Sequence, residues 1–253
     1  EIPGKNMTVE PMRKNTAACI GLASLYIEKK DPDAVMVVLP SDHLILDEDS
    51  YLKAIKTGVK VAKRGENLVT LGIEPTHPET GYGYIDYQEK YTTIDNEDVF
   101  KVNAFTEKPS KEKAQKFIDD GTYLWNSGMF IWQVSTIRKM FAKYMPELHQ
   151  SLEIMKEAIG TEQEEEILTE EFSKLDSISI DYGIMERAEN IYVLPGSFGW
   201  DDIGSWPALE RVEKRDKNGN IINGKHIGID TEDTIVHGDG KIIATVGVED
   251  LVI

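Results

Sequence analysis

The chain has little cysteine, no membrane-length apolar run and no basic excess. The single cysteine, Cys19, cannot form an intrachain disulfide, and no charged-then-apolar leader opens the chain, so a cytoplasmic location is expected. No apolar run approaches the roughly 18 residues that suggest a membrane span. The net charge of −17 argues against nucleic-acid partners, whose binding needs a basic footprint. Small anionic substrates stay possible where basic groups or a divalent cation are local.

A start methionine is also missing. The chain opens "EIPGKNMTVEP" and ends "VGVEDLVI", inside an apolar, strand-like stretch. We therefore expect further residues at both ends. The 253 residues present have room for one large α/β domain with an appendage.

Helical and strand-like segments alternate through most of the chain. Helices are predicted at 15–30, 50–65, 110–121, 135–144 and 146–160, and strands at 34–40, 67–73, 99–109 and 191–196. The β-branched run 34–40 is typical of a strand buried on both faces of a parallel sheet. The alternation predicts an α/β fold with a doubly wound, mostly parallel, Rossmann-like sheet, in which ligands bind beyond the carboxyl ends of the strands. We interpret the acidic run 161–172 as a solvated helix face.

The pattern changes near Asn218. Short apolar strands follow, separated by Asn-Gly, Asp and Gly-Asp-Gly turns, with no helix-length pattern. We predict a main domain over 1–217 and the start of an all-β appendage, either a β-solenoid or a hairpin stack, over 218–253.

Aspartates follow the first and the last strand of the main domain. "VVLPSDH" places Asp42 beyond the first, and "GSFGWDDIGSW" places Asp201 and Asp202 beyond the last. A turn aspartate or a helix cap would explain each of them. Alternatively, two carboxylates from separate loops could hold one Mg²⁺, which prefers one or two carboxylates plus waters and substrate phosphates.

Two polar clusters lie between these aspartates. In "ETGYGYI" the glycines that flank Tyr82, Gly81 among them, permit close backbone approach to a ligand, although a plain glycine turn fits too. In "FTEKPS", Glu107 and Lys108 stand where a strand stops. They could form a surface ion pair, or a carboxylate for sugar hydroxyls beside an ammonium for a phosphate.

A third cluster has the strongest claim to a ligand. "LWNSGMFIW" places a polar turn, Asn126, Ser127 and Gly128, inside an intensely apolar run. Buried polar groups need hydrogen-bond partners. A ligand would supply them.

Taken in order, these segments resemble a known family. They are "VEPMRKNTAA", "VLPSDH", "TGYGYI", "FTEKP", "WNSGMF", "IDYGIME" and "FGWDDIGSW". From about Glu10 to Trp206 their order is similar to that in mannose-1-phosphate guanylyltransferases, also called GDP-mannose pyrophosphorylases, a branch of the sugar nucleotidyltransferases. The β-rich tail resembles the short solenoid that follows the catalytic domain in this family.

Two departures from the family pattern stand out. The glycine-rich "GGxGTRL" loop, which cradles the nucleotide triphosphate in this family, has no counterpart here and would precede Glu1. The family's "NTAPA" is "NTAAC" at 15–19. We interpret that difference as a helix-packing change.

The resemblance implies transfer of GMP from GTP to mannose 1-phosphate, which gives GDP-mannose and pyrophosphate. A phosphate oxygen attacks the α-phosphorus, so no general base is needed, and positioning with cationic neutralisation supplies the catalysis. By similarity, Asp42 and Asp202 would hold Mg²⁺, with Asp201 left as a turn or capping residue. Lys108 would meet the sugar phosphate.

The resemblance also assigns the sugar and the base. Sugar binding would fall to Glu107, Lys108, Asn126 and the segments around Gly81, Tyr82 and Gly128. Asp181 would support that site, or cap a helix. The nucleotide would be bound by Glu10, Lys14, Asn15, Thr16, Ser41 and Asp42. A carboxylate such as Glu10 offers two acceptors to the paired donors of guanine, whereas for Lys14 a solvent-facing lysine at a helix start is the more ordinary interpretation.

Other hypotheses remain open at this stage. The chain could be a non-catalytic, sugar-nucleotide-binding regulatory subunit, or it could act on another hexose 1-phosphate. Some relatives carry a phosphomannose isomerase domain downstream. The β-rich tail could also pair two copies as a homodimer, since exposed β edges often pair.

Overall fold

The computed structural model describes residues 2–204 and 206–253. They form two compact units. The first unit comprises the residues up to Pro40 together with Asp47–Phe198, and the second comprises Ser41–Leu46 together with Gly199–Ile253. The short segment 41–46 thus leaves the first unit and joins residues far along the chain. The predicted boundary between residues 217 and 218 stays a prediction.

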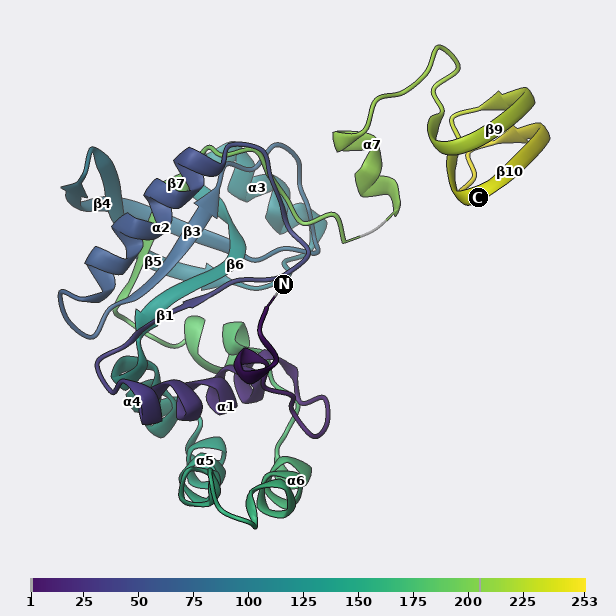
Figure 1. Cartoon of the computed structure of the whole chain (residues 1–253). Helices are drawn as coiled ribbons and strands as arrows, with labels where there is room; N and C mark the ends of the chain where they lie inside the picture. The colour runs from purple at the N-terminus through teal and green to yellow at the C-terminus, as the bar shows by residue number, and fades with distance from the viewer. Residues whose placement is uncertain (1, 205) are drawn as a thin grey trace. The chain divides into compact units, whose positions relative to one another are not determined.

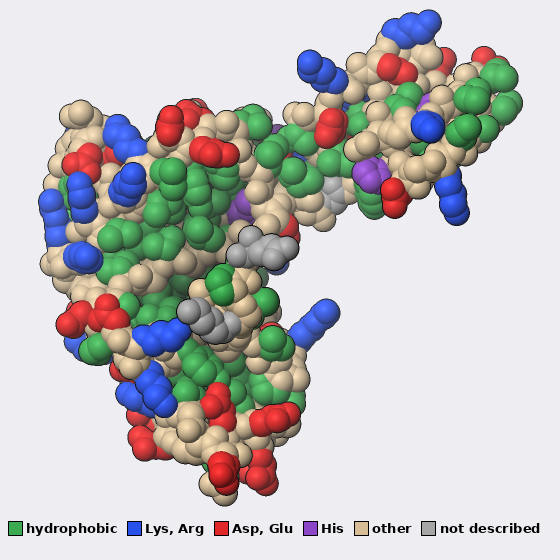
Figure 2. All heavy atoms as spheres, in the orientation of Figure 1, with side chains coloured by type: hydrophobic (Ala, Val, Ile, Leu, Met, Phe, Trp, Pro, Cys, Tyr) green, Lys and Arg blue, Asp and Glu red, His purple; other side chains and the backbone are tan. Residues whose placement is uncertain are grey.

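Six longer helices belong to the first unit. They are α1 (Asn15–Lys30), α2 (Glu48–Ala62), α3 (Lys111–Asp120), α4 (Val134–Tyr144), α5 (Pro146–Ala158) and α6 (Glu164–Lys174). Helix α3 begins and ends as the sequence predicts: the Ser110 side chain accepts a hydrogen bond from Lys113 N, and Gly121 follows with φ +68°. Helix α6 carries the acidic run, and Figure 2 shows acidic side chains gathered at the end of this unit that α5 and α6 form.

The first unit is built on a six-stranded sheet. Its strands are β1 (Val35–Val38), β3 (Leu68–Ile73), β4 (Tyr84–Ile94), β5 (Glu97–Thr106), β6 (Tyr123–Gln133) and β7 (Ile191–Gly196). Their order is β1-β6-β3-β7-β5-β4, with β6 also paired to β4. Helix α2 packs on β3, β6 and β7, whereas α5 and α6 lie beyond α1 and α4, away from the sheet (Figure 1).

The α/β class is confirmed, but the mostly parallel sheet is wrong. Among the described strands of this sheet, only β3 and β7 pair in parallel. Strand β6 runs antiparallel to β1, β3 and β4, and β1 lies at an edge, where Val37 is partly exposed. A β-branched run indicates burial, but it does not fix the direction of the neighbouring strands.

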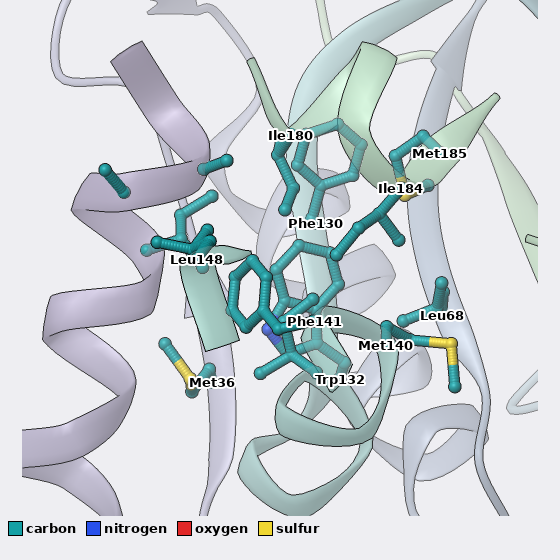
Figure 3. Close-up of a cluster of buried hydrophobic side chains, with 14 of the residues drawn as sticks. Met36, Leu68, Phe130, Trp132, Met140, Phe141, Leu148, Ile180, Ile184 and Met185 are labelled. Carbon is teal, nitrogen blue, oxygen red and sulfur yellow. The ribbon is translucent and has the colours of Figure 1, made fainter. Parts of the chain in front are cut away.

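One buried cluster joins the sheet to the helices below it. Phe130 and Trp132 of β6 stack with ring centroids 5.5 Å apart. Phe141 of α4 packs in the same cluster (Figure 3). So do Ile180, which precedes the five-residue π-helix η2 (Asp181–Met185), and Ile184, which lies within it. The core therefore fixes η2 against β6.

The second unit combines a small β ladder with a parallel β pair. Strand β2 (Leu44–Ile45) pairs antiparallel with β8 (Trp200–Asp201). The 3₁₀ helix η3 (Trp206–Ala208) and α7 (Leu209–Val212) follow. Strands β9 (Ile221–Glu232) and β10 (Ile235–Glu249) then pair in parallel, which confirms the β-solenoid-like appendage. Within the described residues of both units, no helix combines the length and the apolar character that crossing a membrane requires.

Candidate functional site

Strand β6 bulges where the polar turn was predicted. Thr70 of β3 pairs with Phe130, but Gly72 pairs with Asn126, so between these pairs one residue of β3 faces three of β6. Gly128, with φ +70°, takes up the irregularity. The predicted turn is therefore wrong: Asn126 and Gly128 lie in a bulge of one continuous strand, because β6 stays paired to β3 on both sides of it.

The side chain of Asn126 is the centre of a hydrogen-bond network. Its Oδ1 accepts from Thr70 Oγ1 (3.2 Å) and from Gly128 N (3.2 Å), while its Nδ2 donates to Asp181 Oδ1 (3.0 Å). Its backbone N donates to Gly83 O (2.8 Å). The amide thus ties β3, β6, η2 and the glycine segment together, and it is buried.

Glu107 and Lys108 lie at the end of β5, beside this network. Glu107 N donates to Glu186 Oε1 (2.9 Å), and Lys108 N donates to Tyr82 O (3.2 Å). Lys108 has φ +45°, a strained value that a non-glycine residue keeps only where its surroundings enforce it. Its Nζ stands 3.9 Å from Glu107 Oε1, and the lysine side chain is the more exposed of the two.

One carboxylate oxygen of Glu107, Oε2, is buried without a hydrogen-bond partner within the described residues. A Cβ on Gly83 would lie 2.5 Å from that oxygen, so only glycine leaves room beside it. A hydroxyl donor would satisfy it, and an unsatisfied buried acceptor is costly.

Burial and neighbouring charge perturb both carboxyl groups. Burial, with the charges of Asp181 and Glu186, raises the pKa of Glu107 to about 7 against the opposing charge of Lys108. Burial also raises the pKa of Asp181, against hydrogen bonds that include the one from Asn126. Acceptor oxygens beside a single ammonium suit a ligand with several hydroxyls and a phosphate.

In the segment around Gly81 and Tyr82, one backbone N–H group already has a partner. Gly81 N donates to Glu79 Oε1 (2.8 Å), so this N–H is committed within the loop. The Tyr82 ring meets Trp125 edge-on, with centroids 5.3 Å apart.

The segment predicted to bind the nucleotide precedes and opens α1. Burial raises the pKa of Glu10 while Arg13 opposes this, and Glu10 Oε2 is a second buried oxygen with no partner among the described residues. Asn15, with φ +67°, accepts from Thr16 N (2.8 Å). Thr16 Oγ1 in turn accepts from Ile180 N (2.8 Å), which links this segment to η2.

Two interpretations of this segment need correction. Lys14 Nζ donates to Leu175 O (2.5 Å) and Ser173 O (3.3 Å). It satisfies carbonyls at the end of α6, so the interpretation as a lysine that only faces solvent is wrong, while its role at the nucleotide stays a prediction. Cys19 is exposed, and Glu10 is close enough to add to the effect of burial in raising the pKa of its thiol. The helix-packing interpretation therefore fits Ala18, which is buried in α1, and does not fit the exposed Cys19.

In the second unit, the β2–β8 ladder brings the two aspartate segments together. Leu44 pairs with Asp201, so the segment that holds Ser41 and Asp42 meets the one that holds Asp202. Burial lowers the pKa of His43, while Asp42, Asp202 and Asp201 all oppose that shift. Both predicted metal ligands therefore lie near one imidazole, which accepts a hydrogen bond from Trp200 Nε1 at Nδ1 (3.0 Å).

The neighbouring aspartates have different surroundings. Arg211 donates from Nε to Asp201 Oδ2 (2.7 Å) and from Nη2 to Asp201 Oδ1 (2.9 Å), and Ile203 N also donates to Asp201. Asp202 Oδ1 accepts from Gly204 N at 3.3 Å and lies 3.9 Å from Arg211 Nη2. Asp201 therefore holds the loop in a two-pronged ion pair.

The donor chemistry at Asp42 and Asp202 fits Mg²⁺. In the described ranges, no group of three or more His, Cys, Asp or Glu side chains could hold a metal ion. Mg²⁺ does not require such a group, because waters and substrate phosphates complete its six oxygen ligands. An exposed Asp42 is compatible with that arrangement.

The sequence interpretation missed four contributors: Thr70, Glu186, His43 and Arg211. Glu186 is the last residue of the "IDYGIME" segment, and His43 follows Asp42 directly. Both could therefore have been predicted from their neighbours in the sequence. Thr70 lies in a fully buried strand, where the sequence gives no sign of a polar role.

Comparison with known proteins places this geometry in a family. Residues 4–219 match the Nucleotidyl transferase family model, and residues 224–253 match the MannoseP isomerase/GMP-like beta-helix domain. The chain therefore belongs to the nucleotidyl transferase family.

Individual relatives show which members of the family the chain resembles. The chain is 37% identical to a mannose-1-phosphate guanylyltransferase of Escherichia coli (strain K12), over 98% of this chain and 52% of that protein. It thus spans about half the length of this curated relative. A structure described as mannose-1-phosphate geranyltransferase from Thermus thermophilus superposes with TM-score 0.83 at 36% identity, over 97% of this chain and 69% of that one.

A further structure, described as mannose-6-phosphate isomerase from Helicobacter pylori, gives TM-score 0.63 at 30% identity, over 77% of this chain and 73% of that one. The names of these three relatives all refer to a mannose phosphate, and a mannose-1-phosphate guanylyltransferase is among them.

The raised pKa of Glu107 predicts how stability varies with pH. Between about pH 4.5 and 7 the folded state binds more protons at Glu107 than the unfolded state does, so this group makes stability fall as pH rises. Glu107→Gln removes the effect. In urea unfolding without ligands, the free energy of unfolding of the variant relative to wild type should rise by roughly 1–3 kcal/mol between pH 4.5 and 7.5.

The exposed Glu89→Gln serves as the matched control, with a difference from wild type that does not change across this range. A Glu107→Gln difference as flat as that of the control would contradict the assignment.

Proposed function

We propose that the protein which contains this chain transfers GMP from GTP to mannose 1-phosphate, forming GDP-mannose and pyrophosphate. The observation that carries the proposal is the cluster of Glu107, Lys108, Asn126 and Asp181 around an unsatisfied buried oxygen. The similarity to mannose-1-phosphate guanylyltransferases selects the substrates.

The sugar phosphate is bound by this cluster. Lys108 Nζ, the exposed end of its pair with Glu107, receives the phosphate. A sugar hydroxyl donates to Glu107 Oε2, and the Asn126–Asp181 pair accepts from and donates to the neighbouring hydroxyls. Holding the phosphate oxygen in place for attack supplies most of the rate, because both reactants are anions that repel each other in solution.

Asp42 and Asp202 hold the metal ion in this proposal. A bound Mg²⁺ supplies neutralisation of the phosphate charges and a template for their orientation. The burial that lowers the pKa of His43 favours a neutral imidazole near neutral pH, which does not repel a metal cation.

Glu10 selects guanine. Its buried Oε2, which lacks a partner among the described residues, can accept from N1–H or from the exocyclic amine of the base. The hydrogen bond between Thr16 and Ile180 holds the following residues against η2.

The reaction is tested by pyrophosphate release from the complete protein with GTP, Mg²⁺ and a panel of hexose 1-phosphates. Mannose 1-phosphate should support turnover, and the Asp202→Asn variant should reduce it at least about 100-fold, because a neutral amide holds Mg²⁺ weakly. Thermal unfolding should show Asp202→Asn folded.

The adjacent Asp201→Asn variant is the matched control. It should lose stability by about 1 kcal/mol with its ion pair to Arg211, yet keep most of its activity. No turnover with mannose 1-phosphate, or equal losses of activity in the two variants, would overturn the assignment.

Guanine selection is tested separately. In the same assay, Glu10→Gln should cut the preference for GTP over ATP and dTTP by about 10-fold or more, because the amide replaces an acceptor by a donor. Glu162→Gln, the same substitution at an exposed position outside this segment, should leave the preference unchanged. An unaltered preference in Glu10→Gln would remove Glu10 from the base site.

A further inference from the structure

A cavity of about 560 Å³ lies in the first unit, among α1, α5, α6 and η2. Its size falls within the range of small-molecule sites, roughly 300–1,000 Å³. Its buried lining is largely apolar and includes Ala17 of α1, Leu148 of α5 and Leu175 after α6. None of the residues assigned above to sugar, metal or base binding lines it.

The charged side chains that line this cavity differ in whether they have an ion-pair partner. Glu171 is buried, and although burial opposes its ionisation, hydrogen bonds from Lys174 and Ser151 hold its pKa below the ordinary value. Lys174 Nζ stands 2.6 Å from Glu171 Oε1, so these two charges match each other.

Arg187 is different. Its Nη1 donates to Tyr144 O (3.2 Å), and across the described ranges no carboxylate forms an ion pair with it. The guanidinium therefore keeps a positive charge and most of its donors for a ligand. Arg187 and the two other acidic side chains of the lining, Glu147 and Asp176, are all exposed, so water screens their charges alike, but only the guanidinium can hold an anionic group by two parallel hydrogen bonds. One cation beside an apolar wall suits a single anionic group.

The wall nearest the sugar cluster is η2 with the residues before it. Ile178 and Gly183 line the cavity, while Asp181, between them, accepts from Asn126. Ala17 N donates to Ile178 O (3.2 Å). A Cβ on Gly183 would lie 2.5 Å from Met145 Sδ, which leaves this turn no slack against the α4–α5 junction.

Short π-helical turns of this kind are frequent at functional sites. Ile180, Ile184 and Met185 anchor the other side of the turn in the core (Figure 3). A molecule in the cavity would therefore contact the segment that positions Asp181.

We propose that this cavity binds a small amphipathic monoanion, with its apolar body against Leu148 and Leu175 and its anionic group on Arg187, and that the bound molecule packs against the segment 176–187 and protects its backbone from exchange. The proposal does not depend on the reaction assigned above, because neither GTP nor a sugar phosphate is needed to observe it.

The test uses 8-anilinonaphthalene-1-sulfonate as the probe and its neutral parent, N-phenyl-1-naphthylamine, as the comparison. Calorimetric titration of the chain should show one saturable sulfonate site. Arg187→Gln should weaken the sulfonate at least about 5-fold and leave the neutral parent unchanged. Ile154→Asp, at a partly exposed position of the lining, should weaken both probes.

Lys116→Gln removes a charge of the same sign from the exposed face of α3 and should bind both probes as wild type does. Hydrogen exchange followed by mass spectrometry should show exchange in 176–187 slowed several-fold at saturating sulfonate, but not in Ile154→Asp.

Three results would overturn the proposal. Sulfonate binding in Arg187→Gln equal to that in Lys116→Gln would remove the anion site. Undiminished binding in Ile154→Asp would place the probe elsewhere, for example on the exposed isoleucines Ile227 and Ile229 of β9. Unchanged exchange in 176–187 at saturation would show that the occupant does not act on η2.

Discussion

The orientation of one buried amide, Asn126, determines the candidate sugar site. Gly128 N can only donate, so the oxygen it meets must be Oδ1, and Nδ2 must then face Asp181. Thr70, in a fully buried strand, holds the same oxygen from the other side. A buried network of this kind is stable only when every member is satisfied, so the bulge of β6, the position of η2 and the place of Asp181 depend on one another.

Charge imposes a second constraint on the same site. Glu107, Asp181 and Glu186 face a single nearby ammonium, that of Lys108, and one oxygen of Glu107 has no partner in the described residues. Keeping a charged, unsatisfied carboxylate buried is unfavourable, and a ligand hydroxyl that donates to Glu107 Oε2 would satisfy that oxygen. In the proposed sugar site, the free protein therefore gives up stability near neutral pH.

Much of this could be predicted from the sequence, for identifiable physical reasons. The limits of α3 follow from local chemistry at Ser110 and Gly121. Asn126 stands out because its sequence surroundings are apolar, and Glu107 stands out because it lies where a strand stops. Features that depend on partners distant in the chain were missed. Lys14 bonds carbonyls some 160 residues away, and β6 runs antiparallel between strands whose own sequences carry no sign of its direction.

In the proposed reaction, the network around Asn126 holds the hexose. A crystal structure of the complete protein with GDP-mannose and Mg²⁺ tests this directly. Hexose hydroxyls should lie within hydrogen-bond distance of Glu107 Oε2 and of the Asn126 or Asp181 side chain. A hexose bound with these groups still turned only toward one another and toward water would contradict it.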